Sequence, residues 1–160
     1  MGVFTHSAEF VSPVAPQRLF KALVTDSCNL IPKLMPNVVK SIEFVEGDGS
    51  VGSIRQINFQ EGIHPRDAKN RVEALDLENL SYAYTLVNPD ALMEKVETVL
   101  YSVKFGAGPD GGSVNEMKTT YTTKGDAVLT EEELTAGNQK ALGMYKVVEA
   151  YLLGNPDAYA

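Results

Sequence analysis

Three glycines stand in a short polar segment with a spacing that is typical of phosphate-binding loops. Gly47, Gly49 and Gly52 form a G-x-G-x-x-G pattern, which in dinucleotide-binding proteins joins a strand to a helix whose N-terminus binds the pyrophosphate. Here residues 40–45 and residues 53–59, on either side, both read as strands. The glycines therefore predict a hairpin turn that uses their access to positive φ, and they argue against a nucleotide site.

A lysine is the next residue that could do chemistry. In the expected strand 113–123, side chains alternate with a period of two, so Glu116, Lys118 and Thr120 share one face. If this face points inward, Lys118 has a lowered pKa and can act as a base or a Schiff-base amine. An inward face also favours a polar cluster of Glu116, Lys118 and Arg55 that anchors a ligand.

Three expected strands each carry a face that mixes apolar side chains with a few polar groups. This mixture is typical of a small-molecule pocket, which has hydrophobic walls and few polar anchors. The three faces, strand by strand, are Ser53, Arg55, Ile57 and Phe59; then Tyr82, Tyr84 and Leu86; then Glu97, Val99, Tyr101, Val103 and Phe105.

Strands and short helices must position these residues. The pattern predicts an opening strand at 3–11, a helix at 17–24, and a second short helix that begins at Asp26 or Ser27 and ends near Met35. Six strands follow, separated by polar turns, and each can pair with its neighbour in an antiparallel meander. Their expected ranges are 39–45, 53–59, 69–76, 80–87, 96–105 and 113–123.

A long helix is expected at the C-terminal end. Thr130 and Glu133 form a capping box, and Gly154 with Pro156 ends the helix. About 24 residues at 1.5 Å each give a length of roughly 36 Å, which needs a large partner surface such as a curved sheet. Gly137 falls on the apolar side of this helix. A glycine there is either a tolerated loss of helix stability or a residue that leaves room for a ligand.

Composition limits the classes of function. The 160 residues, with 44% hydrophobic and 22% charged side chains, predict one globular domain over residues 1–160. The net charge of −7 argues against general nucleic-acid binding. The single cysteine, Cys28, cannot form an internal disulfide and has no C-x-x-C partner. We expect no metal, no cofactor and nothing beyond a monomer.

The N-terminal residues lack the basic region and apolar run of a signal peptide. No apolar run approaches the ~18 residues of a membrane span. We therefore expect a cytoplasmic protein, with the nucleus as a further compartment.

Motifs along the whole chain give it a family resemblance. They comprise residues 1–4 (MGVF), 18–22 (RLFKA), 29–33 (NLIPK), 46–54, 109–113 (PDGGS), 121–126 (YTTKGD) and 148–153 (VEAYLL). In these motifs the chain resembles the pathogenesis-related class-ten plant proteins, whose best-known member is the major birch-pollen allergen. The resemblance implies an α+β helix-grip fold of the START-like superfamily. In that fold a curved seven-stranded antiparallel sheet wraps around a long C-terminal helix, two short helices support it, and a large hydrophobic cavity lies between.

The resemblance also implies a function. Proteins of this family bind amphipathic small molecules, among them flavonoids and phytohormones such as cytokinins, brassinosteroids and abscisic acid, and are linked to plant defence and stress. Storage, transport or signalling is the expected role. Relatives include abscisic-acid receptors that inhibit a protein phosphatase when liganded, so a phosphatase is a candidate partner.

The resemblance places Arg55, Tyr82, Tyr84 and Tyr101 at ligand-contact positions. The family more often has lysine at the place of Arg55; arginine keeps the charge and offers a planar fork for an anionic or carbonyl oxygen. Without the resemblance, the tyrosines would read as ordinary core aromatics. The full set of ligand-binding candidates is Arg55, Ile57, Phe59, Tyr82, Tyr84, Val99, Tyr101, Lys118, Gly137 and Leu142.

Two enzymatic alternatives come with the resemblance. Norcoclaurine synthases use a catalytic lysine on the strand 113–123, but its position holds Glu116 here, which leaves Lys118 as the synthase candidate. Ribonuclease activity is attributed in some members to residues that match Glu97, Glu149 and Tyr151. Glu149 and Tyr151 stand at i, i+2 on a helix, a spacing that does not face one site. His6 and His64 offer no convincing histidine pair.

Overall fold

The computed structural model describes residues 2–62, 66–87 and 94–160, except the side chains of 136–138, 140 and 141. Within the described residues, seven strands and three α-helices build the chain, and a π-helical turn at Lys21–Thr25 follows the first helix directly. In chain order the elements are β1 (Val3–Ser12), α1 (Pro16–Phe20), α2 (Ser27–Leu34), β2 (Val39–Glu46), β3 (Ile54–Phe59), β4 (Asp67–Asp76), β5 (Ser81–Leu86), β6 (Val96–Ala107), β7 (Ser113–Thr123) and α3 (Glu131–Gly154).

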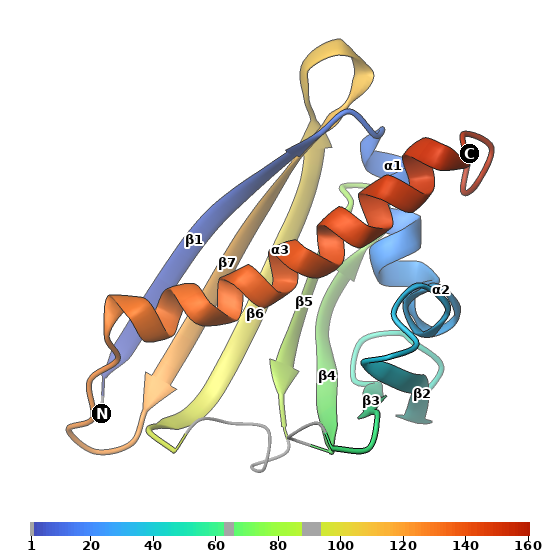
Figure 1. Cartoon of the computed structure of the whole chain (residues 1–160). Coiled ribbons are helices and arrows are strands. Elements are labelled where there is room, and N and C mark those ends of the chain that lie inside the picture. The colour runs from blue at the N-terminus through green and yellow to red at the C-terminus, as the bar shows by residue number, and fades with distance from the viewer. Residues whose placement is uncertain (1, 63–65, 88–93) are drawn as a thin grey trace.

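The strands form one curved antiparallel sheet in the order β1-β7-β6-β5-β4-β3-β2. Strands β2 to β7 pair with their sequence neighbours, so the predicted meander is confirmed. Strand β1 joins β7 instead, which leaves β1 and β2 as the two edges. Figure 1 shows α3 running obliquely across the concave face, with α1 and α2 beside its C-terminal half. The α+β helix-grip architecture predicted from the resemblance is confirmed.

The glycine-rich segment is the turn of the β2–β3 hairpin, as predicted. Gly47, Gly49 and Gly52 have φ values of 79°, 107° and 94°, a region that side chains disfavour. At Gly47 a Cβ atom would also come within 2.3 Å of the Ser53 hydroxyl oxygen. The segment connects two strands and no helix follows it, so the arrangement of a phosphate-binding loop is missing.

The first helix differs in detail from the expected range 17–24. Pro16 occupies the first turn of α1, and the chain then widens into the π-helical turn that ends with a hydrogen bond from the Asp26 N–H to the Lys21 carbonyl, 2.8 Å long. α2 begins directly after this turn, at Ser27. The turn therefore sets the position of Ser27, which contacts a charged residue of the sheet.

The C-terminal half of α3 is fixed to both the sheet and α1. Val148 and Leu152 are completely buried in the main hydrophobic core, together with Leu19 and Phe20 of α1. Arg18 donates hydrogen bonds of 3.0 Å to the carbonyls of Leu152, Asn155 and Ala158. These bonds join α1 to the last turn of α3 and to the residues that follow it, so the helix cannot slide along the sheet without losing them.

The capping box predicted at the start of α3 is present. The Thr130 hydroxyl accepts from the Glu133 N–H at 3.2 Å, and the Glu133 carboxylate accepts from the Thr130 N–H at 3.1 Å. Replacing a threonine N-cap by alanine costs about 1 kcal/mol. We therefore expect Thr130→Ala to lower the free energy of unfolding by about 1 kcal/mol in urea denaturation.

The same substitution five residues later provides the control. Thr135 lies inside α3, where its hydroxyl only donates back to the Glu131 carbonyl, and alanine is the better helix former there. Thr135→Ala should leave stability unchanged or raise it slightly. Equal losses for the two variants would show that the capping box contributes nothing specific.

Candidate functional site

A buried arginine marks the concave face of the sheet. Arg55 lies on β3 and is only 7% exposed, and its strand neighbours Ile57 and Phe59 pack against the main core. The inward face predicted for this strand is thus the one observed. The Arg55 guanidinium donates one hydrogen bond, from Nη1 to the Ser27 hydroxyl at 2.8 Å, while its Nε atom is buried without a partner.

No acidic side chain among the described residues forms an ion pair with Arg55, in contrast to Arg71, which pairs with Glu73, and Lys95, which pairs with Glu133. Burial of a charge is costly unless the charge is paired and hydrogen-bonded. The Arg55 guanidinium therefore retains unused capacity to bind a negatively charged or carbonyl oxygen.

Three tyrosines form a row beside this arginine. The Tyr84 ring stacks on Tyr101, its cross-strand partner, with centroids 4.9 Å apart, and lies 5.1 Å from the Tyr82 ring. The Arg55 guanidinium carbon lies 6.0 Å from the Tyr82 centroid and 5.8 Å from that of Tyr84, within the range of cation–π attraction. The structure thus brings together the four residues that the resemblance placed at ligand-contact positions.

Burial controls the acid–base behaviour of these tyrosines. It raises the pKa of the Tyr101 hydroxyl to about 12 and that of Tyr84 well above its ordinary value, and in Tyr84 the Arg55 charge offsets a small part of the effect. Burial also raises the pKa of Tyr82, again against the charge of Arg55. All three therefore remain neutral hydroxyls at physiological pH, able to donate and accept hydrogen bonds.

Stability should fall at alkaline pH for this reason. A tyrosine whose pKa is higher in the folded than in the unfolded chain contributes stability that is present below about pH 10 and lost as the pH rises through about 12. We expect Tyr101→Phe to reduce this alkaline loss by on the order of 2 kcal/mol. Urea unfolding of both proteins across this range measures it; identical pH profiles would contradict the assignment.

Two polar residues at the concave face of the sheet were not predicted from the sequence. Ser27 orients Arg55, and Asn115 of β7 is completely buried next to the Tyr145 hydroxyl of α3. That proximity lowers the pKa of Tyr145 slightly against the larger rise from burial, although neither amide atom of Asn115 makes a hydrogen bond of ordinary geometry. The alternation of Asn115 with Met117 and Tyr121, both buried, was the signal that could have found it.

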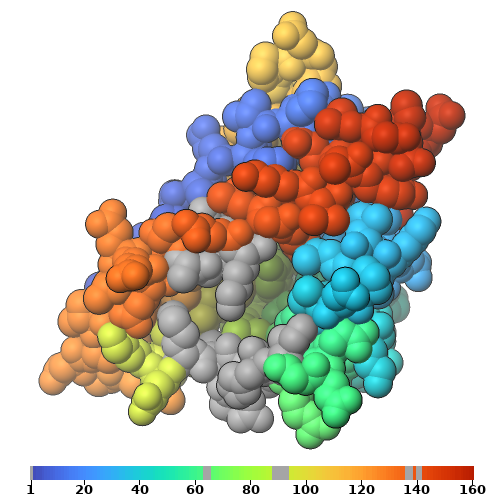
Figure 2. All heavy atoms as spheres, in the orientation of Figure 1, coloured from blue at the N-terminus to red at the C-terminus, as the bar shows by residue number. Residues whose placement is uncertain are grey.

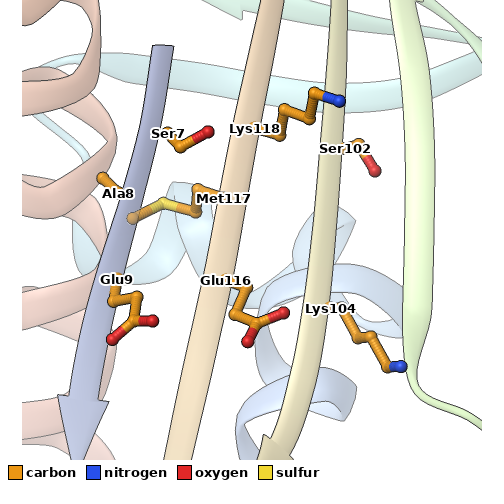
Figure 3. A pocket seen from close by; sticks show the side chains of 8 residues that line it. All are labelled: Ser7, Ala8, Glu9, Ser102, Lys104, Glu116, Met117 and Lys118. Atoms are coloured by element: carbon orange, nitrogen blue, oxygen red, sulfur yellow. The ribbon is translucent and has the colours of Figure 1, made fainter.

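The inward orientation considered for Glu116 and Lys118 is wrong. Both side chains are exposed, whereas Met117 between them is buried. They lie on the outer face with Ser7, Glu9, Ser102 and Lys104 (Figure 3), around an open hollow of about 670 Å³. The predicted cluster of Glu116, Lys118 and Arg55 therefore does not exist, because the odd-numbered side chains of β7 are the ones that face α3.

Glu97 was also assigned to the wrong face. A β-bulge between Val96 and Thr98 makes the pairing of β6 with β7 skip one residue, which shifts the alternation of the strand. Val96 and Val99 are therefore buried, and Glu97 and Thr98 between them are exposed. The predicted inward set keeps Val99, Tyr101, Val103 and Phe105, and loses Glu97.

The other candidates lie on α3. Leu142 is half-buried and packs against the main core, whereas the surroundings of Gly137 lie outside the described side chains. Glu149 and Tyr151 belong to the C-terminal turns of α3, and the Lys33 ammonium lies 5.4 Å from the Tyr151 ring centroid. Figure 1 shows the start of β6, where Glu97 stands, at the opposite end of the sheet, so the three ribonuclease candidates do not form one site.

The described residues contain no group of three or more histidine, cysteine, aspartate and glutamate side chains that could hold a metal ion. Within the same residues, no helix is both long enough and apolar enough to cross a membrane.

Comparison with known proteins gives matches over nearly the whole chain. The model of the family described as "Pathogenesis-related protein Bet v 1 family" matches residues 1–155. The major allergen Pru ar 1 of Prunus armeniaca is 50% identical over 159 residues, which are 99% of each chain. The major strawberry allergen Fra a 1.07 of Fragaria ananassa is 46% identical, with the same coverage.

Solved structures give the same result at the level of the fold. The crystal structure of Ara h 8.0201 superposes with a TM-score of 0.85 at 38% identity, over 96% of this chain and 100% of that one. Norcoclaurine synthase from Thalictrum flavum, in complex with dopamine and hydroxybenzaldehyde, gives a TM-score of 0.76 at 19% identity, over 96% and 88% of the two chains. At that identity the second match concerns the fold alone.

Proposed function

The chain belongs to the pathogenesis-related Bet v 1 family, and we propose that it binds an amphipathic small molecule between the concave face of the sheet and α3. The ligand has an apolar body and an anionic or carbonyl oxygen that accepts from Arg55. Phytohormones such as cytokinins, brassinosteroids or abscisic acid, and flavonoids, are the candidate classes. Storage, transport or signalling in the cytoplasm or nucleus is the proposed role.

The observation that carries this proposal is the unpaired charge of Arg55. Arg55 is 7% exposed as a residue, its guanidinium has one hydroxyl partner, and its buried Nε has none. A charge buried in this way is costly in the ligand-free protein. A ligand oxygen at this position would remove the cost, and hydrogen bonds to a charged group contribute about 1.5–3 kcal/mol each. The fold is also one that binds small hydrophobic ligands in this family.

Incomplete burial of the inward face supports the proposal further. Ile57, Phe59, Tyr84, Tyr101 and Leu142 contact the two hydrophobic clusters, yet each keeps an accessible fraction of its surface. Figure 2 shows the atoms of α3 and α2 side by side over the concave face. Apolar side chains that remain accessible beneath such a cover favour space for a ligand over a fully packed core.

The outer hollow fits this function less well. Its lining combines two lysines, two glutamates and two serines with Ala8 and Met117 and contains no aromatic ring. Pockets for amphipathic ligands are instead mostly apolar, with few polar anchors. Lys118 is an exposed residue of this outer face, so it is not part of the proposed ligand site.

The test is a titration with an anionic dye that fluoresces in apolar surroundings, followed by competition with cytokinins, flavonoids, abscisic acid and steroid hormones. We expect saturable dye binding that one of these classes displaces. Folded protein that binds no dye, and that none of these compounds stabilises against heat, would contradict the proposal.

The enzymatic alternatives can be tested on the same sample. If the protein were a ribonuclease or a synthase, turnover would disappear in Glu149→Gln or Lys118→Met. We expect both variants to retain whatever turnover the purified wild-type protein shows.

A further inference from the structure

Strand β1 forms one free edge of the sheet. β1 is ten residues long, and its register with β7 has no shift. Figure 1 shows it at the rim of the sheet. Among the described residues, no backbone hydrogen bond reaches β1 from any element other than β7 and the Gly2–Thr123 pair at its start.

The opposite edge is protected and β1 is not. β2 has register shifts at Val39/Ser41 and Phe44/Glu46, and its exposed side chains include Lys40, Glu43 and Glu46. Irregularities and charges of this kind prevent pairing between sheet edges. β1 has neither a bulge nor a lysine, and its two outermost valines, Val3 and Val11, are 66% and 56% exposed.

The direction of the free backbone groups follows from the pairing with β7. The Thr123 N–H donates to the Gly2 carbonyl, and hydrogen-bonded pairs alternate along an antiparallel ladder. The even-numbered residues of β1 therefore bond to β7. The free N–H and C=O groups belong to the odd-numbered residues, Val3, Thr5, Ser7, Glu9 and Val11.

We propose that this edge pairs with β1 of a second copy of the same chain, antiparallel about a two-fold axis at Ser7. This register places Val3 opposite the other copy's Val11, Thr5 opposite its Glu9, and Ser7 opposite its Ser7. Every free backbone group from 3 to 11 then finds a partner, and the exposed valines cover one another. Moving the two-fold axis two residues along the strand, to Glu9, would place the two Glu9 carboxylates opposite each other, which like charges disfavour.

Charge complementarity supports the same register. On the outer face Lys118 lies beside Ser7, its cross-strand partner, and Glu9 stands two residues away on the same strand (Figure 3). Neither Glu9 nor Lys118 has an ion pair within the described structure. In the paired sheet, each Lys118 keeps Glu9 of its own chain as a diagonal neighbour at about 7–8 Å and gains Glu9 of the other copy about 12 Å away at Cα, given strands ~4.8 Å apart. Two long side chains can close this distance over the small Ser7.

The pairing creates a continuous sheet across two chains and departs from the monomer expected from the sequence. Its contact consists of one pair of strands, which is small beside the 1,200–2,000 Å² of a typical stable interface. The dimer is therefore weak and depends on protein concentration. It leaves the concave face and Arg55 uncovered, so it is independent of the proposed ligand site.

Sedimentation velocity from micromolar to millimolar protein, at low and high salt, tests the proposal. We expect a monomer–dimer equilibrium that Ser7→Pro weakens roughly tenfold or more, because two intermolecular hydrogen bonds disappear while the ladder with β7 keeps all of its bonds. Ser7→Ala is the matched control and should dimerise like the wild type. If Ser7→Pro fails to fold, Val3→Lys replaces it.

Exchanging the charges of Glu9 and Lys118 distinguishes the loss of an attraction between the two copies from a general destabilisation of the strand. Lys118→Glu should weaken the dimer, and the double variant with Glu9→Lys should restore it. Amide exchange should slow with rising concentration at residues 5, 7 and 9. A protein that stays monomeric at millimolar concentration, or a dimer that Ser7→Pro leaves intact, would overturn the proposal.

Discussion

Arg55→Met is expected to weaken binding of acceptor-bearing ligands by about 10- to 100-fold, which corresponds to the loss of one hydrogen bond to a charged group. The same change should leave the ligand-free protein at least as stable as the wild type. Methionine fills a similar space without a charge, and replacing a buried charged group by a well-packed apolar one is often neutral or stabilising. Calorimetric titration and urea unfolding measure the two effects.

Arg71→Met is the matched control for this prediction. Arg71 lies on β4, next to β3, but its side chain is half exposed and pairs with Glu73 at 2.8 Å. Its replacement should leave ligand affinity unchanged and should change the free energy of unfolding by no more than about 0.5 kcal/mol. A strongly destabilised Arg55→Met protein would mean that the fold itself compensates the Arg55 charge, and the argument for a ligand oxygen would fail.

Leu152→Ala is expected to have the largest effect on stability. Leu152 is completely buried where α3 meets α1 and the sheet, and leucine-to-alanine changes at such positions cost about 2–5 kcal/mol because of lost burial and the cavity that remains. Leu153→Ala, one residue later at 52% exposure, should cost less than about 1 kcal/mol. Urea denaturation of both variants provides the comparison, and similar losses would refute the observed orientation of α3.

The elements that the sequence predicted well are those with local signals. Thr130 and Glu133 stand three residues apart and fix the start of α3 without reference to the rest of the chain. Gly47 and its neighbours likewise encode a turn, because positive φ is a property of the single residue. Arg55 was assigned to the correct face because it alternates with Ile57 and Phe59, whose burial could be anticipated.

The errors came from strands whose faces depend on distant partners. Alternation in β7 defines two faces but does not say which one meets α3, and the buried Met117 on the odd face would have been the better guide than the charged pair on the even face. In β6 the bulge at Val96/Thr98 depends on pairing with β7, so the exposure of Glu97 could not be read from its own strand. Ser27 meets Arg55 only through tertiary structure.

The most direct test of the central claim is a two-dimensional NMR titration with the ligand class that wins the dye competition. If the ligand binds at Arg55, the largest shift changes should fall on the Arg55 Nε–H and on the rings of Tyr82, Tyr84 and Tyr101. Contacts between ligand protons and these rings should appear in the same spectra. Shift changes concentrated on the outer face, at Ser7, Ser102 and Lys118, with unchanged tyrosine rings, would contradict the account.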